Sequence, residues 1–126
     1  MREQFIALLE TFGLPIFLQG SLNEGQTYPD NFFTFWNDRT EDGAHYDNDA
    51  ISFVWSFSVN YYTLNENADK IDDILGEVRQ LFKENGWIIG GVGYDVATDE
   101  PTHIGRAIDV LYVQKNTLKT KNKQGG

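Results

Sequence analysis

The sequence offers only two histidines, His45 and His103, as side chains that could exchange a proton near neutral pH. His103 is the better candidate for a catalytic base, since acidic, hydroxyl and basic side chains surround it in the sequence: Asp95, Asp99, Glu100, Thr102 and Arg106. The segment has no serine at a strand-to-helix turn, and its spacing does not force these side chains to converge. We therefore predict a rigid, hydrogen-bonded turn in which Arg106 pairs with a carboxylate, with a small hydrolase centred on His103 as the alternative.

Residues 38–49 form the most acidic stretch of the chain and match part of a calcium-binding loop. Oxygen-bearing side chains stand at its first, third, fifth and twelfth positions and glycine at its sixth: Asp38, Thr40, Asp42, Asp49 and Gly43. Both flanks have strand character, whereas a calcium hand lies between two helices, and the twelfth position lacks the usual bidentate glutamate. The prediction is a solvated hairpin loop that holds no metal or other cofactor, and a calcium-binding module is the alternative.

A third group, Gly90, Gly91 and Gly93, has the composition of a phosphate-binding loop but not its context. A strand pattern follows these glycines, so the helix N-terminus that such a loop needs is missing. We predict a bent or bulged strand here.

Composition limits the remaining classes of function. The chain has 126 residues, a formal net charge of −9 and no cysteine, which excludes disulfides, thiolate metal sites and a cysteine nucleophile. Two histidines cannot form a three-histidine zinc site. An acidic surface repels phosphate backbones, so specific nucleic acid binding is not expected. The apolar runs are too short to span a membrane, and the expectation is a soluble intracellular protein.

Residue periodicity predicts a single α+β domain over residues 1–114 and a flexible lysine-rich tail over 115–126. The clearest signal is the alternation from Ile51 to Thr63, typical of a long strand with one buried face. A helical stripe follows, begun by a cap at Asn65 or Asn67 and ended by Gly86. The other expected elements are a helix over 5–12 ended by Gly13, and strands over 16–22, 31–37, 87–97 and 106–114.

These elements, in the order α-β-β-β-α-β-β, predict a mostly antiparallel five-stranded sheet with two helices packed on one face. The strand over 31–37 has aromatic residues on both of its faces, more apolar surface than one sheet face can hide. We therefore predict contacts with other subunits or partners at this strand and at the acidic stretch after it, through Phe32, Phe33, Phe35, Trp36, Asp38, Glu41, Asp42, Asp47 and Asp49.

The segment from Gly93 to Arg106, GYDVATDEPTHIGR, follows the helix ending at Gly86 and leads into a strand through Asp109 and Tyr112. Over roughly residues 67–112 this half of the chain resembles small tail proteins of phages and prophages, in particular the tail terminator, or tail completion, proteins of long-tailed phages. The first half is similar mainly in the order of its elements.

The resemblance implies a structural protein without catalytic residues, which forms a ring, usually of six subunits, at the head-proximal end of the tail tube. Its expected partners are further copies of itself, the major tail protein and a head-completion protein. Its expected location is the virion, after assembly in the bacterial host cytoplasm. Another phage head–tail joint, or a minor capsid role, is the alternative within the same class.

Overall fold

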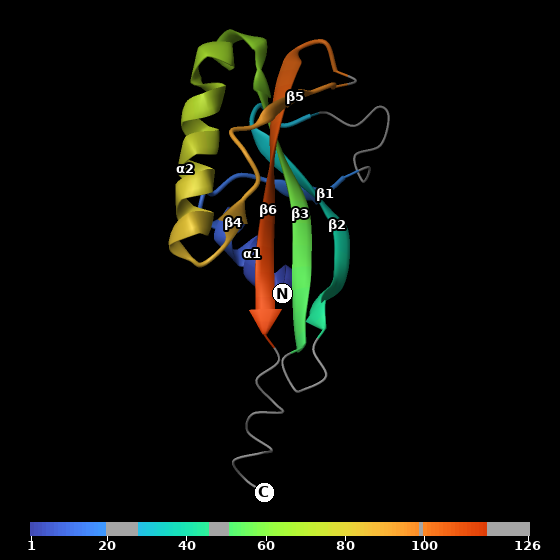
Figure 1. Ribbon diagram of the computed structural model, residues 1–126. Helices are drawn as coiled ribbons and strands as arrows, with labels where there is room; N and C mark the ends of the chain where they lie inside the picture. The colour runs from blue at the N-terminus through green and yellow to red at the C-terminus, as the bar shows by residue number, and fades with distance from the viewer. Residues whose placement is uncertain (20–27, 46–50, 99, 116–126) are drawn as a thin grey trace, which may run out of the picture.

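The computed structural model describes residues 1–19, 28–45, 51–98 and 100–115, with only the backbone described for 38–45, 51, 52 and 115. Figure 1 shows a twisted sheet of long central strands with helices on one side. In chain order the elements are α1 (Arg2–Glu10), β1 (Ile16–Leu18), β2 (Phe32–His45), β3 (Ile51–Leu64), the 3₁₀ segment η1 (Asn65–Lys70), α2 (Ile71–Glu84), β4 (Ile88–Ile89), β5 (Tyr94–Val96) and β6 (His103–Lys115).

The sheet has six strands in the order β1-β2-β3-β6-β4, with β5 also paired to β6. Only β1 and β2 are parallel, and the other pairs are antiparallel. The predicted α+β class is confirmed, but the count of five strands is wrong. The expected strand over 87–97 is divided into β4 and β5 because Gly91 and Gly93 adopt φ values of 118° and 112°, which an extended strand cannot contain.

Strand β2 is much longer than predicted. It pairs with β3 as the expected antiparallel hairpin, but it continues to His45, so the prediction of a loop from Asp38 onward is wrong. Backbone hydrogen bonds to β3 form whatever the side chains are, and register shifts after Asn37 and Asp42 accommodate the extra residues. Residues 46–50, which connect the two strands in the sequence, lie outside the described part of the chain.

The second helix begins differently from the prediction. Neither Asn65 nor Asn67 caps it, because the chain first makes the 3₁₀ segment η1. The side-chain amide of Asn65 instead donates a hydrogen bond through Nδ2 to the Pro101 carbonyl, at 2.7 Å. The amide nitrogen of Asn67 donates to the Thr63 hydroxyl at 3.3 Å. The predicted end is confirmed, since Gly86 follows α2 in the left-handed region at φ 88°.

Both helices pack against the same face of the sheet, as predicted. The amphipathic stripe of α2 is buried on β3 and β6, and Phe5 of α1 stacks on Phe57 of β3 with ring centroids 4.2 Å apart. The core is strongly aromatic on this side. Its buried members are Phe5, Leu9, Phe33, Phe35, Phe57, Val59, Tyr61, Ile71, Leu75, Val78, Phe82, Trp87, Ile108 and Val110.

Candidate functional site

The face of the sheet opposite the helices, which we call the open face, is the part of the molecule with the most unusual surface. Side chains alternate between the two faces of each strand, so the neighbours of the core residues belong to the open face. The pairing registers align these neighbours in rows across the strands. The described ones are Phe17 of β1, Phe32, Thr34 and Trp36 of β2, Val54, Ser56, Ser58, Asn60 and Tyr62 of β3, His103, Gly105, Ala107, Asp109, Leu111 and Val113 of β6, Ile88 of β4, and Tyr94 and Val96 of β5.

One end of the open face is closed by the chain itself. Phe32 stacks on Tyr62 with ring centroids 5.0 Å apart, and Tyr28 lies against both Phe32 and His103. His103 is buried, with Nε2 2.8 Å from the Pro29 carbonyl. A carbonyl oxygen can only accept, so Nε2 carries the proton and Nδ1 accepts from the hydroxyl of the preceding threonine. His103 therefore fixes the segment before β2 against β6.

Buried and half-buried polar groups form the middle of the open face. Asn60 is buried and its amide nitrogen donates to the Thr34 hydroxyl at 2.9 Å. Half-buried Asp109 accepts hydrogen bonds at the same oxygen, Oδ1, from Ser58 at 3.0 Å and from the Tyr94 hydroxyl at 3.1 Å. These bonds hold the carboxylate in a fixed position on the face.

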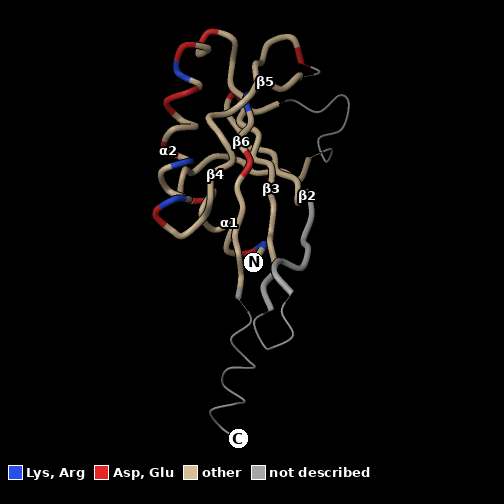
Figure 2. The backbone as a smooth tube through the Cα atoms, in the orientation of Figure 1, with Lys and Arg blue, Asp and Glu red and all other residues tan. Residues whose placement is uncertain are grey.

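At the remaining end of the open face the described side chains are exposed and uncharged, and the side chains of residues 38–45, 51, 52 and 115 lie outside the described part of the chain. Trp36 is 48% exposed and Val113 42%, while Ile88 and Tyr94 are 56% and 46% exposed at the edge of the sheet. Among the described side chains of this face, Asp109 is the only charged one. Figure 2 shows that charged residues gather instead along α2. Folded proteins seldom leave a wide surface uncharged, whereas the centre of a protein–protein interface is depleted of charge.

The structure assigns the predicted interface residues to different places. Phe33 and Phe35 belong to the core under the helices, and Phe32 is buried on the opposite face, so the apolar excess is covered within the chain and these three rings are not available to a partner. Trp36 alone remains exposed. The acidic part of the prediction lies beyond the described side chains: Asp38, Glu41 and Asp42 fall on the backbone of β2, and Asp47 and Asp49 on residues 46–50.

Sequence reasoning missed the open face as a whole. The signal was present in β3, where Ser56 and Ser58 occupy the second face of a long strand and carry no charge. A solvated strand face of this length normally includes lysine or glutamate, and none occurs between residues 51 and 64.

Hydrogen bonds and ion pairs within the chain hold the described side chains around His103. Arg106 lies on the helix-facing side of β6, where its NH1 is 2.7 Å from Asp95 Oδ1 and its Nε 2.9 Å from Asp72 Oδ1. The second contact has the distance of an ion pair but not the alignment of a hydrogen bond. The predicted pairing of Arg106 with a carboxylate is confirmed. His103, Asp72, Asp95 and Arg106 line one hollow of about 580 Å³. The two ring nitrogens of His103 nevertheless contact the Thr102 hydroxyl and the Pro29 carbonyl, and not the carboxylates of Asp72 and Asp95.

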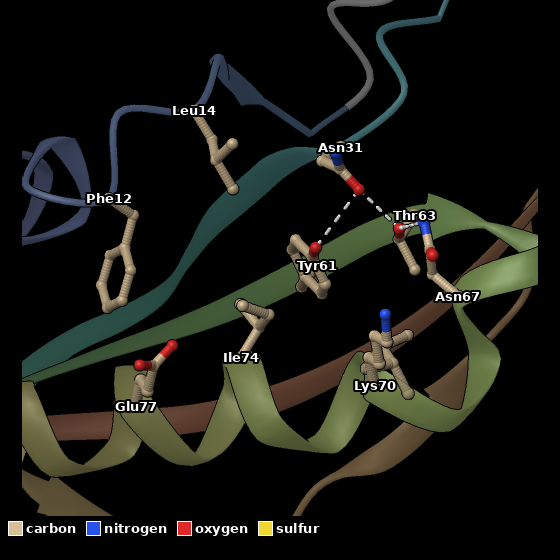
Figure 3. Close-up of a pocket in the computed structure, with 10 residues that line it drawn as sticks. Phe12, Leu14, Asn31, Tyr61, Thr63, Asn67, Lys70, Ile74 and Glu77 are labelled. Atoms are coloured by element: carbon tan, nitrogen blue, oxygen red, sulfur yellow. Dashed lines mark hydrogen bonds between the residues drawn. The ribbon is translucent and has the colours of Figure 1, made fainter.

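A second candidate site is a cavity of about 420 Å³ on the helix side of the sheet. It lies between α2, the segment that follows α1, the start of β2 and the end of β3 (Figure 3). Asn31 Oδ1 accepts hydrogen bonds there from Thr63 at 2.5 Å and from the Tyr61 hydroxyl at 3.4 Å. Burial raises the pKa of Tyr61, and its hydrogen bond to Thr63 lowers the pKa by less. Lys70 and Glu77 line the same cavity. This lining can form hydrogen bonds, but it includes no histidine or serine that could act as a base or nucleophile.

Metal ligands are not assembled in the described part of the chain, where no three histidine, aspartate or glutamate side chains lie close enough to hold an ion. The calcium-like positions Asp38, Thr40 and Asp42 have only their backbone described, and Asp49 lies outside the described residues. No helix in the described part of the chain is both long enough and apolar enough to cross a membrane.

The comparisons with known proteins add no relative. No protein-family model matches the sequence, and no curated protein matches it either.

Proposed function

We propose that this chain is a structural assembly protein of the phage tail terminator kind, which acts by self-association and by contact with a tail tube and a head-completion protein. The observation that carries the proposal is the exposure of two apolar side chains, Trp36 and Val113, at one end of the open face. A sheet covered by helices on one face only leaves the other face for solvent or for a partner. The side chains of this face suit a partner better than solvent.

The arrangement of the open face supports a contact made by a preformed surface. Asn60, Thr34 and Asp109 are already held by hydrogen bonds within the chain, so their side chains lose little freedom when the face is covered. Trp36 provides the large, exposed aromatic group that typically contributes most at the centre of an interface. Assembly through surface complementarity requires no catalytic group and no cofactor.

The overall charge fits the same role. With a net charge of −9, a ring of such subunits repels the phosphates of DNA and would let a genome pass through its centre without binding it. In this proposal the protein is located in the virion after assembly in the bacterial host cytoplasm. Another phage head–tail joint, or a minor capsid position, would use the same surface.

The test is the molar mass of the protein by light scattering, alone and mixed with tail-tube subunits of a long-tailed phage. The proposal predicts a species of several times the 14.4 kDa protomer mass, or an arrest of tube growth visible by electron microscopy. A protein that stays monomeric at every concentration and leaves tube length unchanged would contradict it. Addition of calcium in parallel tests the alternative module, since binding raises the melting temperature of the protein.

A further inference from the structure

The charge on the open face restricts what can cover it. Asp109 accepts hydrogen bonds from Ser58 and Tyr94, yet within the described residues no lysine or arginine forms an ion pair with it. A partner that covers this face removes the carboxylate from water, which is unfavourable unless the partner brings a cation. Two copies packed through their open faces would cover both Asp109 carboxylates, and the described side chains of that face include no cation to pair with them. Symmetric pairing through this face is therefore disfavoured.

A surface with the matching chemistry lies on the other side of the same protomer. We call it the basic edge and define it by Gly76, Arg79 and Lys83 of α2 together with Gly91 and Val92 of the segment between β4 and β5. Arg79 and Lys83 lie on one stripe of α2 and line a hollow of about 410 Å³ with Gly76 and Gly91. Neither cation forms an ion pair within the described residues.

The basic edge also presents an apolar group. Val92, which follows the hollow-lining Gly91 in the chain, is 76% exposed, the largest exposure of any large apolar side chain described. The basic edge thus presents one exposed apolar side chain, Val92, and two cationic side chains, Arg79 and Lys83. Among its described side chains, the open face presents exposed apolar groups and one carboxylate, Asp109, which hydrogen bonds hold in place. The two surfaces are complementary in charge and in polarity.

Building on the proposed function, we propose that the open face of one protomer receives the basic edge of a second copy, with Arg79 and Lys83 placed around Asp109. Because α2 covers the face opposite the open one, both surfaces of a protomer are free to be used at the same time. Such a head-to-tail contact produces a closed ring when its rotation closes and a filament when it does not. A second copy thereby supplies the helix layer that the open face lacks.

Cross-linking between engineered cysteines tests the arrangement directly, since the chain has no cysteine of its own. Ser56→Cys places a thiol on the open face beside Leu111, and Gln80→Cys places one at the hollow of the basic edge. With a short bismaleimide, the inference predicts a ladder of dimers and larger species for the double variant. It also predicts cross-linked dimers for an equal mixture of the two single variants. A strong dimer from Ser56→Cys alone would mean face-to-face pairing and would overturn the inference.

Charge reversal gives the second measurement, by sedimentation velocity on the full chain. Asp109→Lys and the pair Arg79→Glu with Lys83→Glu should each weaken self-association at least about tenfold, and a mixture of the two variants should restore it. Lys70→Glu is the control for reversal of a positive charge on the same side of the chain, because it replaces a cation by a carboxylate outside both surfaces, and it should behave as wild type. Asp109→Asn, which keeps an oxygen acceptor for Ser58 and Tyr94, should weaken association without unfolding the protein.

The outcomes separate this inference from the proposed function. If the wild type self-associates but charge reversal and cross-linking have no effect, the inference is wrong and the proposed assembly role stands. If the wild type neither self-associates nor affects tail tubes, both are wrong.

Discussion

Replacement of Gly105 by alanine should destabilise the fold, because this position of β6 has no room for a methyl group. A Cβ placed there would lie 2.6 Å and 2.7 Å from two ring carbons of Tyr62 and 2.8 Å from a methyl group of Val96. Separations below 3.0 Å require something to move. The Tyr62 ring cannot withdraw easily, since it is stacked on Phe32, which is itself buried.

The expected cost is that of overpacking a core, about 1–3 kcal/mol of the free energy of unfolding. For a domain of this size each kcal/mol corresponds to roughly 3–5 °C, so Gly105→Ala should lower the melting temperature by roughly 3–15 °C. Gly76→Ala is the control for a glycine with free space: its Cβ would meet only Arg79 at 3.8 Å. In the interior of α2 that substitution should stabilise the protein by about 1 kcal/mol.

A double-mutant cycle identifies the cause. With Tyr62 also changed to alanine, the obstructing ring is gone, and the loss caused by Gly105→Ala should shrink by at least about 1 kcal/mol. Circular dichroism melts of the four proteins measure the coupling. A Gly105→Ala protein with the wild-type melting temperature, or an equal loss with and without the Tyr62 ring, would refute the proposed packing of Tyr62 on Gly105.

Three further substitutions test other parts of the structure. His103→Ala removes the donor to the Pro29 carbonyl and leaves a cavity, so urea titration should show a loss of about 2–3 kcal/mol, and wild-type stability would contradict the anchoring role. Arg106→Gln should cost no more than about 1 kcal/mol, because both partner carboxylates are largely exposed, and the difference from wild type should shrink in about 0.5 M salt. Burial raises the pKa of Tyr61 in the folded state, so the folded state favours the neutral phenol. This contribution to stability is fully present below the unfolded pKa of 10.0 and is lost as pH rises through the folded-state pKa. Tyr61→Phe should therefore lose less stability between pH 9 and pH 11 than wild type, and identical alkaline unfolding curves would contradict this.

The fold was largely predictable because its main elements have strong periodic signals. The alternation from Ile51 to Thr63 corresponds to β3, and the stripe that ends before Gly86 corresponds to α2. Burial of one face of each element explains why these predictions are confirmed. The class and the placement of both helices then follow, since a single sheet face can cover both apolar stripes.

Other features depend on contacts between distant segments and could not be read locally. The polar residues after Trp36 indicated a loop, yet pairing with β3 extends β2 to His45. The aromatic residues on both faces of β2 indicated an exposed interface. In the structure the helices cover one face, and Phe32 is enclosed by Tyr62, Tyr28 and His103 on the other. The open face, on which Asp109 is the one charged residue among the described side chains, appears only when β3 and β6 are placed side by side.

The measurement that tests the central claim most directly is the molar mass of wild type and Trp36→Ser by light scattering over the same range of protein concentration. Trp36 is 48% exposed, so its replacement should leave the melting temperature of the protomer nearly unchanged. The account predicts a concentration-dependent mass well above 14.4 kDa for wild type and a shift towards the monomer mass for Trp36→Ser. Equal oligomeric masses for both proteins would show that the open face does not mediate assembly.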